Sequence, residues 1–522
     1  MALKFDIKQR RVIPNWRDFK RTMRLGELSN SVSTQRPDIS VLRPINDWQQ
    51  NRNIGTAADL VNSAFISGKT EFPELNEAIS YIIGNKDQSS RSLFELATSI
   101  SEGTRQTPKN DNINQSKLID LEVEDFDDFK IHLENNTIYK IINKTKNKIT
   151  TQPYNSILWV ELARLYSFLG NESKAEKAMT VALGLSPNNR FVLRSATRMF
   201  IHFDNLDKAL YYLRKSDATR FDPWLISAHI ATSSLMKRFS PLIKNGISII
   251  NSKKFSEYDL TELASSIGTL ELSEGRLKKS RELLELSLKS PNDNSLAQLE
   301  WLARIEKKIQ FNLHDFRGRV SNTFEAFTLE NFQGENWKES LGNSIKWFLD
   351  IPYSKRPVLF GSFVASVFLK DYDTAVLLCE SGLNANPLDP SILNNLVYAL
   401  ASQNNIEKAT YYSEMFNKVK LNQYPDSEKI MQLATLGLVH FRSNNIPMGK
   451  SLYEQAIEKA RIIKDDYLRD LAIVNYTKEL ILINDSEKDT FVQMSDNISE
   501  SGRKDLVFFK NEIKDLIKKI EK

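Results

Sequence analysis

The sequence has almost no cysteine, since Cys379 is the only one among 522 residues. An intramolecular disulfide is therefore excluded, and we expect a reducing compartment. Residues 1–6 contain no apolar stretch of the kind found in secretory signals. The longest apolar run, residues 358–369, is about a dozen residues long, whereas a helix that spans a bilayer needs about 20. These absences predict a cytoplasmic protein without a membrane span.

The sequence also lacks the motifs of common enzyme classes. It contains no G-x-G-x-x-G loop, no G-x-S-x-G elbow and no H-E-x-x-H helix. The tripeptides that start at Gly68 and Gly449 match the end of a phosphate-binding loop. However, Ser63 and Asn444 stand where that loop needs its first glycine. We therefore expect no catalytic residue and no cofactor.

Residues that could bind a metal ion are few and scattered. An acidic cluster at residues 120–128 lacks the central glycine and the alternating ligands of a calcium loop. The histidines are far apart in the sequence and have no cysteine at a ligand spacing. They are His132, His202, His229, His314 and His440. We expect no metal site, and we interpret Cys379 as a buried structural thiol.

Positive charge is concentrated at the start of a nearly neutral chain. The net charge is +5, and residues 1–24 alone contain eight basic and two acidic residues. Apolar side chains alternate with these cations. Three interpretations stay open: the segment packs on the protein's own body, binds a partner protein, or binds nucleic acid. The residues concerned are Arg10, Arg11, Trp16, Arg17, Lys20, Arg21 and Arg24.

One stretch of 34 residues, 156–189, carries the spacing of a helical hairpin. Large residues recur on one helical face, small residues mark close approach of two helices, a glycine marks the turn, and a proline ends the unit. The positions are Trp159, Leu162, Ala163, Tyr166, Gly170, Ala175, Met179, Ala182 and Pro187. This pattern resembles the tetratricopeptide repeat, whose period is about 34 residues.

The resemblance implies neighbouring hairpins, because one hairpin cannot bury its apolar face alone. Equivalent positions recur in the next unit and in three later units. They include Leu193, Ala196, Phe200, Ala209, Leu359, Ala375, Gly382, Leu393, Leu400, Ala409, Gly437, Tyr453 and Ala456. The predicted fold is all-α, a tetratricopeptide-like helical-hairpin solenoid with an extended basic N-terminal arm and a C-terminal capping helix.

Residues that cap or end helices, together with local composition, suggest seven regions. They are an extended basic arm at 1–54, a small helical segment at 55–103, a linker with the acidic cluster and a lysine-rich stretch at 104–150, a first array at 151–310, an insertion at 311–335, a second array at 336–484 and capping helices at 485–522. An insertion of this length in a compact array is typically functional or mobile.

The resemblance also implies which side chains line the inner groove, because the first helix of each hairpin does so in this family. In the first array these are Arg164, Arg194, Arg198 and His202. Guanidinium groups along one strip suit carboxylates, phosphorylated segments or a nucleic-acid backbone. The alternative is that they pair with acids of the same chain, such as Glu161 or Asp207.

In the second array the corresponding groove positions are mostly apolar. They are Phe360, Val364, Asn394, Tyr398, Ala434, Leu438 and Phe441. Exposed apolar surface of this extent marks an interaction site, which an amphipathic helix or an extended segment would cover. The alternative is that the protein's own C-terminal helix or the insertion fills this groove.

Together these features leave three functional hypotheses, although the sequence names neither partner nor pathway. The first is a non-catalytic scaffold or adaptor, a complex subunit that binds a peptide or helix of a partner protein through its grooves and its basic arm. The second is a recognition or regulatory subunit of a nucleic-acid-associated bacterial assembly in stress response or anti-phage defence, and it rests only on the basic arm and the arginine strip. The third is a catalytic helical-repeat enzyme with an unrecognised site.

Overall fold

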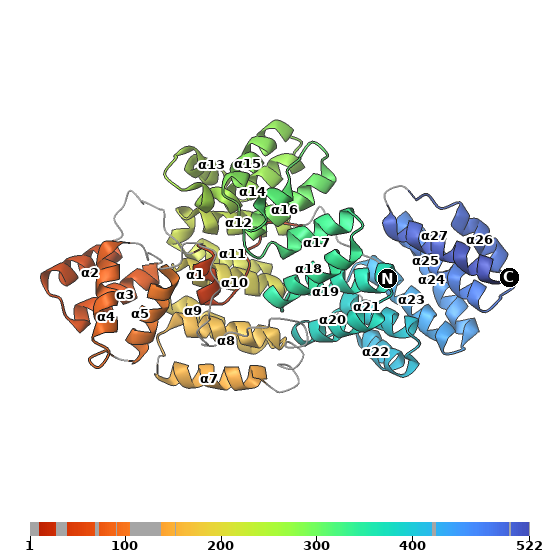
Figure 1. Ribbon diagram of the computed structural model, residues 1–522, viewed down its shortest axis with the longest axis horizontal. Helices are drawn as coiled ribbons and strands as arrows, with labels where there is room; N and C mark the ends of the chain where they lie inside the picture. The colour runs from red at the N-terminus through yellow and green to blue at the C-terminus, as the bar shows by residue number, and fades with distance from the viewer. Residues whose placement is uncertain are drawn as a thin grey trace. The chain divides into compact units, whose positions relative to one another are not determined.

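The computed structural model describes residues 10–27, 39–67, 72–89, 91–104, 137–151, 153–419, 424–500 and 503–520. Every regular element in these ranges is a helix, and no β-strand occurs in them (Figure 1). The expected all-α fold is therefore confirmed. No helix in the described ranges combines the length and apolar character needed to cross a bilayer. The acidic cluster at 120–128 lies outside the described residues.

The chain divides into two compact units. The N-terminal unit contains the described residues up to Phe327 together with Leu349–Ile351, and the C-terminal unit contains Thr328–Phe348 and the described residues from Pro352 onward. The helices before the boundary are α1 (Phe19–Arg24), α2 (Ile39–Gln50), α3 (Ile54–Ser67), α4 (Pro73–Gly84), α5 (Arg91–Thr104), α7 (Thr137–Thr151), α8 (Ser156–Phe168), α9 (Glu172–Leu185), α10 (Arg190–His202), α11 (Leu206–Lys215), η2 (Asp217–Arg220), α12 (Pro223–Leu235), α13 (Ile243–Asn251), α14 (Glu257–Ser273), α15 (Leu277–Lys289), α16 (Asp293–Ile305) and η3 (Leu313–Phe316).

Two helices, α17 (Phe324–Gln333) and α18 (Trp337–Asp350), contribute residues to both units. The remaining helices belong to the C-terminal unit. They are α19 (Lys355–Val364), the π-helical turn η4 (Ala365–Leu369), α20 (Tyr372–Ala385), α21 (Pro390–Ser402), α22 (Ile406–Lys418), α23 (Asp426–Arg442), α24 (Ile446–Ile462), α25 (Asp466–Leu482), α26 (Lys488–Asp496) and α27 (Lys504–Ile520).

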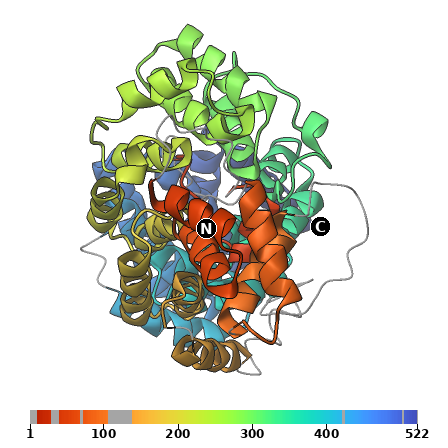
Figure 2. The same cartoon turned by 90° about the vertical axis from the view of Figure 1, so that its left-hand side faces the viewer.

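Consecutive helices pair as hairpins within each unit. The N-terminal unit has the pairs α8/α9, α10/α11, α12/α13 and α14/α15, and the C-terminal unit has α19/α20, α21/α22, α23/α24 and α25/α26. First helices of successive hairpins also touch, as α10 touches α8 and α12. Within the N-terminal unit, Figure 2 shows the group α12–α16 above the group α7–α11. The predicted helical-hairpin solenoid is thus confirmed.

The hairpin α8/α9 has the interior that its sequence predicts. Ala163, Ala175, Met179 and Ala182 are fully buried, so the two helices approach closely where the side chains are small. Gly170 ends the first helix with φ of 61°. That left-handed conformation is the reason for a glycine at this turn.

The turn at Gly170 recurs through both units as a local sequence signal. The next residue, Asn171, donates its backbone N–H to the Tyr166 carbonyl and accepts from the Lys174 N–H through its side chain. A helix C-terminus and the next N-cap are thereby joined. A residue with positive φ that is followed by Asn or Asp also occurs at several later turns. These residues are Asp204, Glu335, Lys370, Asn404, Asn444, Lys464 and Asn484.

Helix α2 differs from the extended arm that was expected for residues 1–54. It forms although Pro44 lies inside it, and a proline in a helix interior removes a backbone hydrogen bond. Val41 and Trp48 lie seven residues apart and are buried, and the Trp48 ring contacts Tyr81 of α4 at 5.4 Å between centroids. Tertiary packing of this apolar face outweighs the local cost of the proline.

Residues 311–335, expected to be an insertion, contain η3 and α17. These elements pack on α16, because Leu296 and Ala297 of α16 share a buried cluster with Leu313, Ala326 and Phe327. The apolar residues of this stretch therefore continue the helical packing.

Two glycines allow the close approach of α23 and α24. A Cβ atom added at Gly449 would lie 2.6 Å from Cδ2 of Phe441, and one added at Gly437 would lie 2.8 Å from Cδ2 of Tyr453. We expect Gly449→Ala to lower the free energy of unfolding by about 1–3 kcal/mol through overpacking. Urea denaturation of the variant and the parent protein measures this loss.

The matched control is Gly184→Ala in α9, where an added Cβ meets no atom within 4 Å. Alanine is the better helix former, so this variant should gain up to about 1 kcal/mol. Equal midpoints for the two variants would show that α23 and α24 are not in close contact at Gly449.

Candidate functional site

Residues 10–27, here called the arm segment, lie inside the N-terminal unit. Residues 10–18 have no regular secondary structure, and Phe19–Arg24 forms the short helix α1. Helix α1 lies beside α10 (Figure 1), where the rings of Phe19 and Phe191 are 5.2 Å apart between centroids. Trp16 is 1% exposed. Of the three interpretations of the basic residues, the described contacts correspond to packing on the protein's own body.

Arg17 is the central cation of the arm segment. Its Nη2 atom donates to Asp293 Oδ2 at 2.5 Å and to Asp350 Oδ2 at 2.6 Å. Its Nη1 atom is 3.5 Å from Glu27 Oε1. Arg17 is 3% exposed, so one guanidinium neutralises carboxylates from α16, α18 and the arm segment itself, away from bulk water.

Arg194 of α10 lies in a second ion-pair cluster in the same groove. Its guanidinium donates to Glu262 at 2.8 Å and to Glu27 at 3.0 Å, and it stacks over the Trp224 ring at 4.7 Å. The sequence suggested an exposed groove position. The structure instead shows Arg194 buried, because the arm segment brings Glu27 to it.

Three further arginines of the arm segment, Arg10, Arg11 and Arg21, also contact helices of the unit. Arg10 donates to Glu325 at 2.9 Å, to Gln298 at 2.8 Å and to Asn294 at 3.1 Å. Arg11 donates to Ser234 Oγ. Arg21 forms an ion pair with Asp350, Lys20 is half-buried, and the Arg24 side chain lies outside the described residues.

Arg164 is buried as well and follows the alternative named for it. Its Nε and Nη2 atoms donate to Glu161 Oε2 at 2.9 and 2.7 Å. The other oxygen of Glu161 accepts the Phe19 N–H at 3.1 Å, so this pair also holds the first turn of α1. Arg198 and His202 are half-buried, and the His202 ring lies against Phe203.

Burial and ion pairing act in opposite directions on the carboxyl groups. Burial raises the pKa of Asp350, but the charges of Arg17 and Arg21 outweigh it, and the net pKa is lowered. The pKa of Glu262 is likewise lowered, because the charge of Arg194 and hydrogen bonds from Asn294 and Asn292 outweigh its burial. At Asp293 and Glu27, by contrast, burial outweighs the neighbouring guanidinium groups and raises the pKa, that of Glu27 to about 7.

The C-terminal unit buries the apolar residues predicted for its groove. Phe360, Val364, Asn394, Tyr398, Leu438 and Phe441 are all at most 5% exposed, which corrects the exposure expected from the sequence. Phe360 packs on the Phe332 ring of α17 at 5.2 Å, and Phe441 packs on Tyr453 and Tyr476. These positions belong to the core because neighbouring helices cover them.

Helix α27, predicted to cap the array, packs on η4 and α25. Its Glu512 forms ion pairs with Lys370 at 3.1 Å and with Lys478 at 2.7 Å. The Phe508 ring lies 5.5 Å from the Phe368 ring of η4. That the C-terminal helix fills the second groove stays a prediction.

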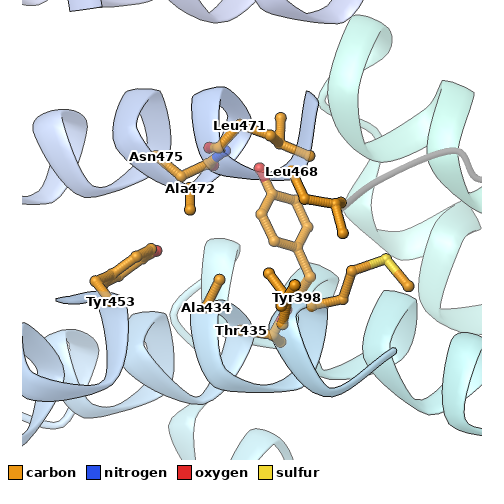
Figure 3. A pocket seen from close by; sticks show the side chains of 10 residues that line it. Tyr398, Ala434, Thr435, Tyr453, Leu468, Leu471, Ala472 and Asn475 are labelled. Carbon is orange, nitrogen blue, oxygen red and sulfur yellow. The ribbon is translucent and has the colours of Figure 1, made fainter. Parts of the chain in front are cut away.

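A pocket remains open between α21, α23 and α25 (Figure 3). Its empty volume of about 370 Å³ includes space that is open to solvent. Of the predicted groove residues, Tyr398 and Ala434 line it. The wall is mainly apolar, with Thr435 and Asn475 as polar groups. Such a lining suits an apolar side chain of a bound segment.

Cys379 is fully buried in α20. Burial raises the pKa of its thiol to about 12, so the thiolate that reacts with electrophiles is scarce at neutral pH. We expect no labelling by a maleimide in the native protein and stoichiometric labelling after denaturation. Rapid labelling of the native protein would show that this thiol is accessible.

The sequence analysis did not identify the acids of these ion-pair clusters. Glu27, Glu262, Asp293 and Asp350 have no shared motif, and Glu27 and Glu262 are far apart in the chain. One signal was present: Glu262 stands beside the apolar residues Leu260, Leu263 and Ala264 in the sequence. A charged residue at a core position indicates a buried partner. Among the described residues no group of three or more potential ligands is arranged to hold a metal ion.

The comparisons with known proteins identify one repeat of a known family in the chain. Residues 157–189 match the model of the family described as tetratricopeptide repeat, and no curated protein matches the sequence. Among solved structures, yeast Tom70 is 14% identical with a TM-score of 0.31, and the match covers 90% of this chain and 99% of that chain. The Naa15/Naa10 structure bound to HypK-THB is 14% identical with a TM-score of 0.22, over 91% of this chain and 84% of that chain. The chain is thus an all-helical hairpin protein whose stretch 157–189 is recognised as a tetratricopeptide repeat.

Proposed function

We propose that this protein is a non-catalytic scaffold that holds partner proteins in the cytoplasm. The observation that carries the proposal is that the groove of the N-terminal unit accommodates a length of polypeptide, the arm segment, through buried side-chain contacts. A surface that binds its own chain in this way has the shape and the hydrogen-bonding groups to bind another. The mechanism is positioning of partners, with no bond made or broken.

The C-terminal unit offers the second contact surface. The pocket beside Tyr398 is open to solvent and has a mainly apolar lining, which supports contact with an apolar side chain of a partner segment. Such a pocket is the usual setting for the anchor residue of an interface. The partner is therefore a helix or an extended peptide with an apolar anchor.

The nucleic-acid hypothesis has less support than the sequence suggested. The guanidinium groups of Arg10, Arg17 and Arg194 donate hydrogen bonds to carboxylates and amides of the same chain. Cations that contact phosphates must be free to replace condensed counterions. Binding that weakens steeply with salt would revive this hypothesis.

The test begins with cross-linking of the tagged full chain in its host and identification of the proteins captured in constant ratio. A candidate is then purified, and its affinity is measured by calorimetry. Ala434→Phe fills the pocket and should weaken binding at least tenfold, whereas Tyr411→Ala, at an exposed side chain, should not. The proposal would be contradicted by a purified partner whose affinity does not change when the pocket or the groove is altered. Reproducible catalytic turnover by the purified protein would also contradict it.

A further inference from the structure

The arm segment contacts the N-terminal unit as a bound peptide does. Residues 10–18 lack regular secondary structure, and their contacts reach helices that are far away in sequence. Arg10 meets α16 and α17, and Arg17 meets α16 and α18. These two arginines are seven residues apart and bind neighbouring residues of α16, Asn294 and Asp293. The segment is therefore held against α16 by two guanidinium groups.

The groove walls select a cation by burying carboxylates. Asp350 is 7% exposed and Asp293 is 8% exposed. Both come from helices of the unit and not from the arm segment, and both pair with Arg17. An unpaired buried carboxylate is strongly unfavourable. A segment that covers these carboxylates must therefore bring cationic groups that pair with them. The groove repels phosphate for the same reason, which excludes a nucleic-acid backbone as its occupant.

Such pairs contribute selectivity more than net stability. The desolvation of two buried charges consumes most of the energy of their attraction, and apolar side chains of similar volume often stabilise a core equally well. An occupant that brings the same arginines can therefore replace the arm segment at little net cost. What it must overcome is the effective concentration of the tethered segment.

We propose that the inner groove of the N-terminal unit is a receptor for an extended, arginine-bearing segment of a partner protein, and that residues 10–27 occupy it as an intramolecular ligand that such a segment displaces. The proposal rests on the scaffold function and specifies its ligand. The recognised pattern is two arginines seven residues apart, with an aromatic residue directly before the second, as in Arg10, Trp16 and Arg17.

The test uses a fluorescent peptide with the sequence of residues 10–27 and the full-length chain that carries Arg17→Ala. This change weakens the resident segment but leaves the groove walls intact. We expect the peptide to bind this variant saturably and to raise its melting temperature. Its binding to the parent chain should be at least about 100-fold weaker, because the tethered segment competes.

Peptides with defined substitutions show which side chains the groove recognises. A peptide with Arg17→Lys keeps the charge but loses the two-pronged geometry, so we expect it to bind about tenfold more weakly. A peptide with alanine at both Arg10 and Arg17 should not bind measurably. On the protein side, Asp350→Asn added to Arg17→Ala should abolish binding, whereas Glu77→Gln, at an exposed ion pair, should leave it unchanged.

Two results would overturn the proposal: a folded Arg17→Ala chain that does not bind the parent peptide, or equal binding of the doubly substituted peptide. If the Arg17→Ala chain does not fold, Arg10→Ala serves as the weakened chain, since Glu325 is partly exposed. Failure here would make the arm segment a permanent part of the core. A partner captured through the Ala434 pocket would then still support the scaffold function.

Discussion

Replacing Arg17 with alanine is expected to lower the free energy of unfolding of the N-terminal unit by about 3–5 kcal/mol. The substitution removes the cation that the two carboxylates share. Asp350 then keeps only its ion pair with Arg21, and Asp293 keeps a hydrogen bond from Asn15. Burial disfavours the charged form of Arg17, yet Asp293 and Asp350 raise its pKa above the ordinary value. The loss is measured by urea denaturation, followed by tryptophan fluorescence.

The control is Arg52→Ala. Arg52 pairs with Glu77 at 2.8 Å, but the two side chains are 59% and 48% exposed, so water screens the pair and the expected loss is below about 1 kcal/mol. Adding Asp350→Asn to Arg17→Ala should recover part of the larger loss, because one of the two carboxylates that lost Arg17 no longer carries a charge. Similar losses for the two single variants would show that the Arg17 cluster is hydrated.

The sequence is sufficient to predict the hairpins where the helices are short and closely packed. Ala163, Ala175 and Ala182 recur at helical spacing because only small residues allow the approach of α8 and α9. The left-handed residue followed by Asn or Asp is equally local, since both its conformation and its capping bond involve neighbours in the chain. Such signals need no knowledge of the tertiary structure.

Helix α2 and the occupied groove of the N-terminal unit were not predictable in this way. Pro44 is unfavourable in a helix by itself, and only the contact of Trp48 with Tyr81 explains why α2 forms. Arg194 has the same spacing on α10 whether its groove is open or filled. Its partner Glu27 is 167 residues away, and no local pattern indicates which distant segment covers a helix face.

A buried histidine on α12, His229, is expected to make the stability of the N-terminal unit depend on pH. His229 is 1% exposed. Its Nδ1 atom lies 2.9 Å from Ser240 Oγ, and its Nε2 atom accepts from Arg214 Nε at 3.4 Å. Because Nε2 accepts, the neutral ring carries its proton on Nδ1 and donates it to Ser240. Burial, and then the charge of Arg214, lower the pKa of His229 to about 4.

The expected consequence is a loss of stability on acidification. In the unfolded chain a histidine takes up its proton near pH 6.5, whereas His229 in the folded protein stays neutral down to about pH 4. The unfolded state thus binds more protons in this window, and the free energy of unfolding falls as the pH is lowered through it. The loss reaches about 3 kcal/mol by pH 4.

Comparison with His229→Gln isolates this effect from the carboxyl groups that titrate in the same range. The difference in unfolding free energy between the parent protein and the variant should be constant above about pH 7 and should change by about 1.4 kcal/mol per pH unit between about pH 6 and pH 4.5. Glutamine has no titrating group, so its own curve lacks this component. Urea denaturation at half-unit pH steps measures both curves. Parallel curves would mean that His229 has the same pKa in the folded and unfolded states, which contradicts a pKa lowered by burial and by Arg214.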